Sequence, residues 1–375
     1  MKKILFLLNN MNIGGTEKSF LYLLGTLSPE EYDVTLLLLE KSGGFLEYVP
    51  AWVHIRKMPG WGAMRAEIME LQLKVVKQYI KEGKLIRAFC LAFLHLLFKI
   101  TDDRALYCKY VLNRKTKLSE KFDTAIAYAG PFDFLTVFAL YYVEAKEKVQ
   151  WIHFDVSKFH FNTKMCRRLY TRFDRINVVS DEAKNALIEK IPEIAPKTKT
   201  FLNIVSAEQC RMMADMGDGF ADGYTGGGIR IVTVGRLSAE KGQDIIPETA
   251  AYLKKHSIAF RWYLVGDGKL RPSIERKCAE FGTSDEIVFL GTTPNPYQYL
   301  KQADLYVQTS VHEGFCITLA EAKAFDLPII STDCAGAHEQ LDGIPHCHVI
   351  ERSVEAIGDA ILAEVRLISN VAQQN

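Results

Sequence analysis

The sequence lacks several patterns that mark other classes of protein. None of its eight cysteines forms a C-x-x-C pair, which argues against a zinc site or a disulfide framework and favours a reducing cytoplasm. A formal net charge of +1 gives no overall basis for nucleic-acid binding. No D-x-D pair is present, which argues against a carboxylate-held metal at a diphosphate. We therefore expect no metal and no other cofactor.

Long hydrophobic runs are also missing. The basic residues Lys2 and Lys3 precede the apolar run Ile4–Leu8, but five residues followed by two asparagines are too few for a signal peptide or a membrane span. A buried parallel strand is the better interpretation of this run.

The chain is long enough for two domains. It has 375 residues, of which 48% are hydrophobic, and this suits two globular α/β domains with large cores. We expect an N-terminal domain over 1–205, a linker over 206–228 without periodicity, and a C-terminal domain over 229–375.

The N-terminal half alternates strands and helices. Gly14, Gly15 and Thr16 follow the first strand, where open α/β sheets bind ligands, although the G-x-G-x-x-G fingerprint is absent. The expected strands are Ile4–Leu8, Val34–Leu39, Phe122–Tyr128, Lys148–His153, Arg175–Val179 and Thr198–Leu202. The expected helices are Lys18–Leu27, Phe132–Glu144, Phe159–Phe173 and Asp181–Lys190, the last capped by Ser180.

A basic helical insert interrupts this pattern at about 64–117. It is expected to form the helices Ala66–Glu82, Lys84–Ile100 and Asp102–Lys117, and residues 74–121 hold twelve Lys and Arg against four acids. One interpretation is an amphipathic segment that lies on an anionic membrane surface, so that the protein is peripheral on the inner face of the membrane. The other is a helical cover on the sheet with a solvated basic face.

The C-terminal half repeats the α/β pattern. Its expected strands are Ile229–Val234, Arg261–Val265, Ile287–Leu290, Leu305–Gln308 and Pro328–Ser331. Its expected helices reach Lys255 and cover Leu270–Phe281, Pro296–Gln302 and Ser353–Ile368. Two doubly wound halves of this kind predict a ligand site in the crevice between them.

The stretch 310–322 holds the most informative pair of carboxylates. Glu313 lies in a strand-end loop, and Glu321 lies about a turn and a half into the following helix, which is expected to reach Phe325. The first N–H groups of a helix attract anions. The spacing suits a ligand with a central phosphate and hydroxyls at both ends, such as a nucleotide sugar.

Two cations and one imidazole complete the candidate site. Arg236 and Lys241 share a loop of the same domain and could hold a diphosphate in place of a metal. His153 ends a strand of the first domain, where it could hydrogen-bond a sugar hydroxyl or could be a core histidine bonded to the backbone.

The order of these motifs resembles a known family. Gly14-Gly15, Trp151-Ile152-His153-x-Asp155, Val179-Ser180, Asn203, Val234-Gly235-Arg236-Leu237-x-x-x-Lys241-Gly242, Val265-Gly266-x-Gly268 and Glu313-Gly314-Phe315-(x)5-Glu321 follow one another along nearly the whole chain. Together they resemble a retaining glycosyltransferase of the GT4 group. That family has the GT-B architecture, two Rossmann-like domains that face a central cleft. Cys316 stands where the family often has Gly, and 203–206 lacks the usual Pro and Asp.

The resemblance implies roles for these residues. Glu313 would contact the donor sugar near the N–H groups of Gly314, Phe315 and Cys316, and Glu321 would bind the ribose. Arg236 and Lys241 would bind the diphosphate, with N–H groups near Ile317 and Thr318 facing phosphate. Gly15 would approach the donor, Gly14, Gly15 and Thr16 would lie on the acceptor side, and His153 would lie near the transferred sugar. Catalysis would consist of positioning by His153 and Glu313 and charge support by Arg236 and Lys241.

The implied reaction is transfer of a hexose from a nucleotide diphosphate, preferably UDP, to a saccharide or lipid-linked acceptor of a surface polymer. Two alternatives stay open at this point. One is a nucleotide-sugar epimerase of the same fold, and the other is a catalytically silent protein that binds sugar nucleotides or glycans.

Overall fold

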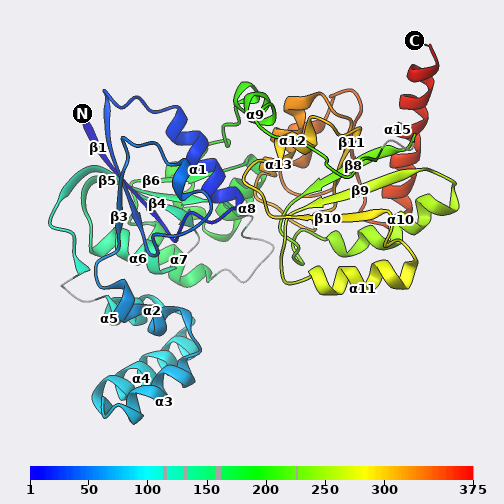
Figure 1. Ribbon diagram of the computed structural model, residues 1–375. Helices are drawn as coiled ribbons and strands as arrows, with labels where there is room; N and C mark the ends of the chain where they lie inside the picture. The colour runs from blue at the N-terminus through cyan, green and yellow to red at the C-terminus, as the bar shows by residue number, and fades with distance from the viewer. Residues whose placement is uncertain (113–115, 131–132, 155, 157–161, 225–226, 375) are drawn as a thin grey trace. The chain divides into compact units, whose positions relative to one another are not determined.

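The computed structural model describes residues 1–112, 116–130, 133–154, 156, 162–224 and 227–374 (Figure 1). The chain divides into two compact units. Unit 1 comprises Met1–Asn12 and Thr16–Leu202, and unit 2 comprises Asn203–Asn375 with Ile13–Gly15. Each unit is built on one parallel sheet, as the alternation of strands and helices predicts.

Unit 1 holds a seven-stranded parallel sheet in its described residues, in the order β3-β2-β1-β4-β5-β6-β7. The strands are β1 (Lys2–Leu8), β2 (Tyr32–Leu38), β3 (His54–Lys57), β4 (Lys121–Gly130), β5 (Glu144–Ile152), β6 (Arg175–Val178) and β7 (Thr198–Thr200). The apolar runs of β1 and β2 are buried, as expected for parallel strands covered on both faces. Strand β3 was not predicted, because this short edge strand is mostly exposed and carries little hydrophobic signal.

The helices of unit 1 follow the predicted order; the bounds of α8 are those predicted, and those of the other helices are shifted. They are α1 (Gly15–Gly25), α6 (Asp133–Tyr141), α7 (Thr163–Tyr170) and α8 (Asp181–Lys190), with short 3₁₀ turns η1 (Leu46–Tyr48) and η3 (Pro192–Lys197). The predicted cap of α8 is confirmed, because Ser180 Oγ accepts a hydrogen bond of 3.1 Å from the N–H of Ala183. The start of the helix predicted at Phe159–Phe173 lies outside the described residues.

In its described residues the helical insert forms four helices, where three were predicted. They are α2 (Trp61–Met69), α3 (Gln72–Lys81), α4 (Leu85–Thr101) and α5 (Ala105–Val111). The prediction of one helix over Ala66–Glu82 was wrong, because Glu70 and Leu71 adopt extended backbone angles that end α2 and begin α3. Part of the helix predicted at Asp102–Lys117 lies outside the described residues. The insert projects from one end of unit 1, and the hairpin of α3 and α4 lies farthest out (Figure 1).

One buried carboxylate connects three helices of the insert by hydrogen bonds. Glu67 of α2 is fully buried and accepts bonds of 2.6 and 2.8 Å from the guanidinium of Arg87 on α4. It also accepts a 2.7 Å bond from the hydroxyl of Tyr79 on α3. The Glu67 carboxylate outweighs burial and holds the pKa of Arg87 above its ordinary value. Arg87 is therefore an internal partner of Glu67 and belongs to the inner face of α4.

Unit 2 holds a six-stranded parallel sheet in its described residues, in the order β10-β9-β8-β11-β12-β13. The strands are β8 (Ile229–Val234), β9 (Phe260–Val265), β10 (Ile287–Gly291), β11 (Leu305–Gln308), β12 (Ile329–Thr332) and β13 (Cys347–Ile350). The predicted bounds of β8 and β11 are confirmed, and β13 was missed. Because β11 pairs with both β8 and β12, the loops that follow these three strands meet at one edge.

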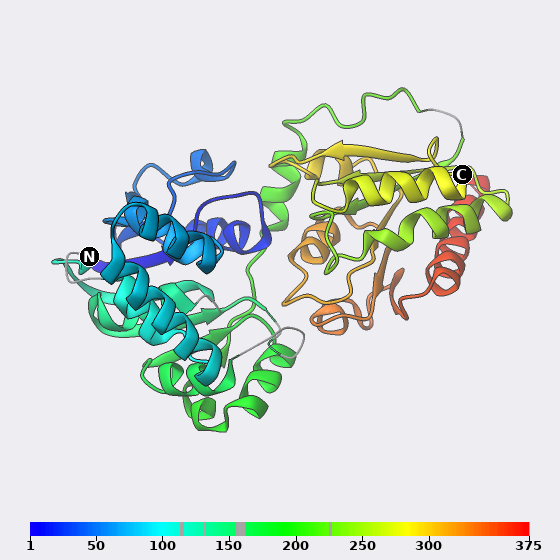
Figure 2. The same cartoon turned by 90° about the horizontal axis from the view of Figure 1, so that it is seen from below.

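Helices cover both faces of this sheet, as the view from below shows (Figure 2). They are α9 (Ala207–Ala214), α10 (Ile246–Lys255), α11 (Arg271–Phe281), α12 (Tyr297–Leu300), α13 (Ile317–Ala322), α14 (Ala337–Leu341) and α15 (Val354–Gln374), with 3₁₀ turns η4 (Gln243–Ile245) and η5 (Lys323–Phe325). The helix predicted up to Phe325 is therefore α13 followed by η5.

The segment predicted as a linker is largely ordered. Its helix α9 packs against α12 and η5 of unit 2. Farther along, Asp222 accepts bonds from Arg261 (2.7 Å) and Tyr263 (2.6 Å) of β9, and the ring of Phe220 lies 4.1 Å from that of Tyr263. The assignment of 206–228 as a linker stays a prediction; the lack of periodicity in this polar, glycine-rich sequence did not reveal α9 or these contacts.

Candidate functional site

The candidate site of unit 2 is built on the loop between β11 and α13. Thr309 Oγ1 donates to the carbonyl oxygen of Lys241 at 3.1 Å, and the N–H of Val311 donates to Glu240 O at 2.9 Å. From the other side, Thr332 Oγ1 donates to Ser310 O at 2.6 Å. The loop is therefore fixed to the strand-end segments after β8 and at the end of β12.

Glu313 is held by two donors in this loop. Its Oε1 accepts a charge-assisted hydrogen bond from Lys241 Nζ and a 2.7 Å bond from Ser310 Oγ. The Glu313 side chain is 11% exposed and that of Lys241 is 25% exposed. Burial by itself lowers the pKa of Lys241, but the Glu313 carboxylate outweighs it and holds that pKa above its ordinary value. The pair is oriented while both side chains still reach the surface.

Cys316 occupies a backbone position that favours glycine. It is the N-cap of α13 with φ 60° and ψ 60°, a left-handed conformation that L-residues rarely adopt. Its Sγ lies 3.4 Å from Cys334 Sγ and 3.4 Å from Ala335 O, and burial raises the pKa of this thiol. The side chain therefore points into the loop after β12 and packs there.

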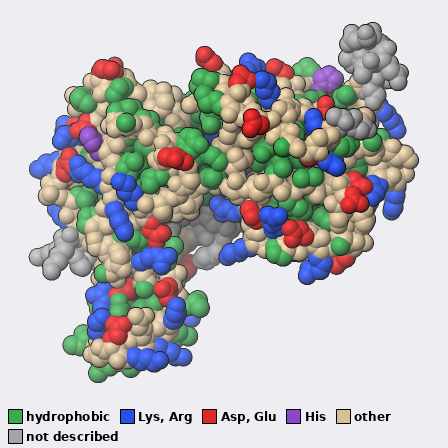
Figure 3. Space-filling model, viewed as in Figure 1, with side chains coloured by type: hydrophobic (Ala, Val, Ile, Leu, Met, Phe, Trp, Pro, Cys, Tyr) green, Lys and Arg blue, Asp and Glu red, His purple; other side chains and the backbone are tan. Residues whose placement is uncertain are grey.

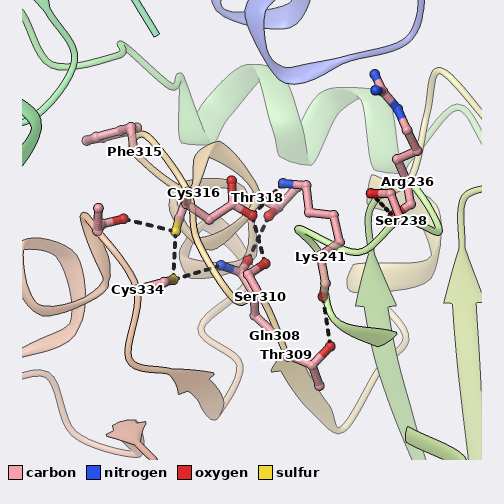
Figure 4. A network of polar contacts seen from close by, with 12 residues as sticks. Arg236, Ser238, Lys241, Gln308, Thr309, Ser310, Phe315, Cys316, Thr318 and Cys334 are labelled. Carbon is pink, nitrogen blue, oxygen red and sulfur yellow. Dashed lines mark hydrogen bonds and ion pairs between the residues drawn. The ribbon is translucent and has the colours of Figure 1, made fainter. Parts of the chain in front are cut away.

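A set of polar contacts fixes the start of α13 (Figure 4). Thr318 Oγ1 donates to Gln308 Oε1 at 2.9 Å, and Tyr306 OH donates to the same oxygen at 3.2 Å. Gln340 Nε2 donates to the carbonyl oxygen of Phe315. The buried Ile317 is the first residue of the helix, and among the described residues no side chain caps it.

Glu321 lies deeper than the prediction implies. Its side chain is fully buried on α13, and it accepts a 3.0 Å hydrogen bond from Tyr297 OH of α12. Its assignment to a ribose stays a prediction, and the structure adds Tyr297 as its partner.

Arg236 does not join the Lys241–Glu313 pair. It is exposed, and its guanidinium points away from the end of Lys241 (Figure 4). Its carbonyl oxygen accepts bonds from Gln243 Nε2 (3.0 Å) and Ser238 Oγ (3.3 Å), so the backbone of this loop is fixed while the side chain extends outward.

The glycines of this half have a packing reason. A Cβ on Gly242 would lie 2.3 Å from Thr309 O, one on Gly266 would lie 2.0 Å from Gly235 O, and one on Gly268 would lie 2.3 Å from Leu237 O. These distances leave no room for a side chain between the loops. From the sequence, these glycines were recognisable only as part of the family motifs.

A residue far along the chain completes the loop support. Arg352 precedes α15 and donates to Thr309 O at 3.2 Å, to Gly242 O at 3.0 Å and to Asp244 Oδ1 at 2.8 Å. One guanidinium therefore connects the loops after β8 and β11. Arg352 was not predicted from the sequence, because no local pattern links it to residues about 40 and 110 positions earlier.

In unit 1, His153 lies just after β5. It is 7% exposed, and its ring lies 4.5 Å from that of Tyr128 and 6.1 Å from that of Trp151. Burial lowers its pKa to about 3, against the opposing effect of a hydrogen bond with the backbone of Tyr128. Within the described residues its Nε2 has no hydrogen-bond partner. A neutral imidazole with one open nitrogen can donate to or accept from a hydroxyl.

The predicted residues Gly14, Gly15 and Thr16 lie at the start of α1. Gly15 is the first residue of the helix and is exposed, Gly14 directly precedes it, and Thr16 follows. Neither glycine is among the described residues with positive φ. Because glycine has no side chain, the backbone at this helix start is accessible to a ligand.

Asp155, which belongs to the same sequence motif as His153, lies outside the described residues.

No cluster of metal ligands appears in the part of the chain that the structure describes. Among those residues, no three His, Cys, Asp or Glu side chains are grouped so that they could hold an ion. The prediction of metal-independent activity stays a matter for experiment.

Known proteins match both the sequence and the fold. Residues 228–366 match the family described as glycosyl transferases group 1. Residues 228–366 carry the sequence of a group 1 glycosyltransferase domain. An uncharacterised glycosyltransferase of Methanocaldococcus jannaschii is 25% identical over 171 residues, which cover 44% of this chain and 41% of that protein. An uncharacterised glycosyltransferase of Haemophilus influenzae is 22% identical over 348 residues, 91% of this chain and 83% of that one.

The fold of the whole chain matches solved GT-B glycosyltransferases. HepE of Anabaena, in complex with UDP and glucose, superposes with a TM-score of 0.68 at 17% identity, covering 97% of this chain and 90% of that one. The first curated relatives align over less than half of their own length. The predicted fold class is confirmed. Glu313 and the loops around it lie within the residues that match the family.

Several residues of the glycosyltransferase domain were missed from the sequence. They are Gln308, Ser310, Cys334, Gln340 and Arg352, which hold the loops of the site. Ser310 could have been found, because it stands three residues before Glu313 in the same loop. The others come from separate segments, and only the fold brings them together.

Proposed function

We propose that the protein is a retaining glycosyltransferase that moves a hexose-type sugar from a nucleotide diphosphate to a saccharide or lipid-linked acceptor. The observation that carries this is the Glu313 carboxylate, oriented by Lys241 and Ser310 in the group 1 domain. A carboxylate with unused lone pairs on a rigid loop is suited to accept hydrogen bonds from sugar hydroxyls.

UDP is the preferred nucleotide in this proposal. Structures of the neighbour HepE contain UDP, UDP with glucose, or UDP-glucose. Relatives include a protein of amylovoran biosynthesis and a lipopolysaccharide 1,6-galactosyltransferase. These names support synthesis of a surface polysaccharide or glycolipid as the context.

The leaving diphosphate would be stabilised by cations of the loop after β8. Lys241 carries its charge at neutral pH beside Glu313, and Arg236 has an exposed guanidinium free to turn toward a bound ligand. We assign the diphosphate to these two side chains, with the backbone of Gly314, Phe315, Cys316, Ile317 and Thr318 beside the sugar and phosphate. Glu321 is assigned to the ribose.

The acceptor would be handled by unit 1. Its neutral His153 has an open Nε2, which suits a hydrogen bond with a hydroxyl of the transferred sugar or of the acceptor. The exposed Gly15, with the half-buried Gly14 and Thr16 on either side of it, would offer its backbone to the acceptor.

Replacement of Glu313 tests the proposal. Glu313→Gln keeps the size of the side chain but removes the charge that orients Lys241. We expect release of UDP from a UDP-hexose with acceptor to fall by about a hundredfold or more. Glu280→Gln, a surface change on α11, is the matched control and should leave the rate unchanged. If Glu313→Gln retains activity within a few-fold, the role of this carboxylate is refuted.

The product distinguishes the reaction from the alternatives. Incubation with donor alone should give no epimer, whereas an epimerase would produce one without acceptor. Proton NMR of the glycoside should show the anomeric configuration of the donor, and an inverted product would refute retention. Activity that persists in EDTA would support metal independence.

A further inference from the structure

The helix α4 carries a second apolar face that nothing in the described structure covers. Its inner face includes the buried Ala88 and Leu91. On the outer face Ile86, Phe89, Phe93, Leu96 and Ile100 recur at spacings of three and four residues, and each is between 55% and 82% exposed. Surface helices normally turn polar residues to water, so a regular apolar stripe indicates a partner.

The neighbouring helix α3 extends this surface. The three residues between α3 and α4 make an antiparallel hairpin, and the two helices pack side by side (Figure 1 and Figure 2). On α3, Leu73 is 75% exposed and Ile80 is 53% exposed. We call these two residues and the five of α4 the hairpin stripe.

Positive charge accompanies the hairpin stripe. Lys77, Lys81 and Lys99 are exposed and form no ion pair with any residue that the structure describes. Four of the five acids of the insert are occupied within the protein, in the pairs Glu67–Arg87, Glu70–Lys74, Glu82–Lys84 and Asp103–Arg168. Blue basic and green hydrophobic side chains are mixed over the projecting helices (Figure 3). The surface that remains is therefore both apolar and cationic.

A hollow beside the stripe adds a place for a phosphate. It has a volume of about 410 Å³ and its lining includes Lys74, Lys99, Arg104 and His95 together with the apolar Leu73 and Phe98. One carboxylate, Glu70, also lines it and is paired with Lys74 at 2.8 Å, so Lys99 and Arg104 are the cations left for a phosphate. Arg104 is positioned by a 2.9 Å bond to Ile68 O. Cations over an apolar lining match a lipid headgroup phosphate and the first atoms of its acyl chains.

We propose that the α3–α4 hairpin is a membrane-docking surface for anionic lipid. The hairpin lies in the plane of the interface, the hairpin stripe enters the acyl boundary, and the lysines and the hollow bind headgroup phosphates. In the described chain no helix is long and apolar enough to cross a membrane. A second copy of the chain fits less well, because docking two stripes would bring the unpaired lysines of both copies together.

Binding to vesicles tests this surface. The full chain should float with vesicles of phosphatidylcholine and phosphatidylglycerol and should remain behind with phosphatidylcholine alone. The triple change Lys77→Gln, Lys81→Gln and Lys99→Gln should reduce partitioning roughly hundredfold at low salt, at roughly fivefold for each charge. The triple change Ile86→Ser, Phe89→Ser and Phe93→Ser should abolish flotation. The matched control Phe281→Ser with Leu367→Ser, exposed apolar residues of unit 2, should float like the unmodified protein.

A second measurement does not depend on removing the stripe. Tryptophan fluorescence of Phe89→Trp should shift to the blue and be quenched by brominated lipid, while Phe281→Trp should show neither effect. Failure to float with anionic vesicles, or equal effects at 89 and 281, would overturn the proposal. So would light scattering that shows a dimer which the stripe variant converts to monomer.

The surface does not depend on the donor site. Donor hydrolysis by the stripe variant, measured with soluble UDP-hexose, should equal that of the unmodified protein. Loss of flotation with intact hydrolysis supports the docking surface, and loss of hydrolysis by Glu313→Gln is a separate result.

Discussion

Acid should destabilise unit 1 through His153. Burial between aromatic rings lowers the pKa of this imidazole from 6.5 to about 3, so the folded chain keeps it neutral. In the unfolded chain the same group binds a proton as soon as the pH falls below its ordinary pKa. Its contribution to stability is therefore complete above pH 6.5 and is lost progressively as the pH falls toward 3.

The size of the effect follows from these two pKa values. Between pH 7 and pH 5 the unfolded imidazole goes from mostly neutral to almost fully protonated, while the folded one stays neutral. The linkage relation then gives a loss of about 2 kcal/mol in the free energy of unfolding. This would be a substantial part of the stability of an ordinary domain.

Urea unfolding followed by tryptophan fluorescence measures this loss. Trp151 stacks on His153 with ring centres 6.1 Å apart, so it reports the local transition. His153→Phe keeps an aromatic ring and removes the titrating group, so it should lose about 2 kcal/mol less than the unmodified protein between the two pH values. Equal losses in both proteins, or an NMR titration of the His153 ring with a pKa near 6.5, would refute the reasoning.

Three further changes test the packing. Glu67→Leu leaves Arg87 without its buried partner and should lower the free energy of unfolding by about 3 kcal/mol, measured in urea, whereas Glu82→Gln on the surface should leave it nearly unchanged. Cys316→Gly should change the free energy of unfolding by no more than about 1 kcal/mol, because glycine tolerates the φ of 60° at this position. Cys316→Val should lower it by about 2 kcal/mol. A valine variant more stable than the unmodified protein would contradict the left-handed backbone. Gly268→Ala should lower the free energy of unfolding by about 1–3 kcal/mol and so lower the melting temperature. Gly62→Ala, which has open space around it, should not.

The fold was predictable from the sequence where local patterns are strong. Buried parallel strands form continuous apolar runs, and β8 and β11 have the bounds that their runs predict. Ser180 predicted the start of α8, because serine is a favoured N-cap residue, and its Oγ does cap the helix. The short edge strand β3 and the helix α9 were missed, because a few tertiary contacts and not a local period decide them.

The site was predictable in its main residues and not in their arrangement. Spacing and residue type singled out Glu313 and Lys241, but not that Lys241 would bond to the carboxylate. The depth of Glu321 and its partner Tyr297 depend on how α12 packs against α13. No sequence pattern contains that information, since it arises from the packing of separate elements.

The guanidinium of Arg352 has a consequence for any attempt to shorten the chain. It belongs to the segment before α15, yet it bonds to the backbone of Gly242 and Thr309 beside the candidate site. An ammonium on a flexible stem lacks the planar fork that reaches both carbonyls at once, so Lys is not an equivalent residue here. A fragment that stops before 352 would keep every motif recognised in the sequence. It would lose the hydrogen bonds by which Arg352 connects the loops after β8 and β11. The functional boundary of unit 2 therefore lies beyond its last strand.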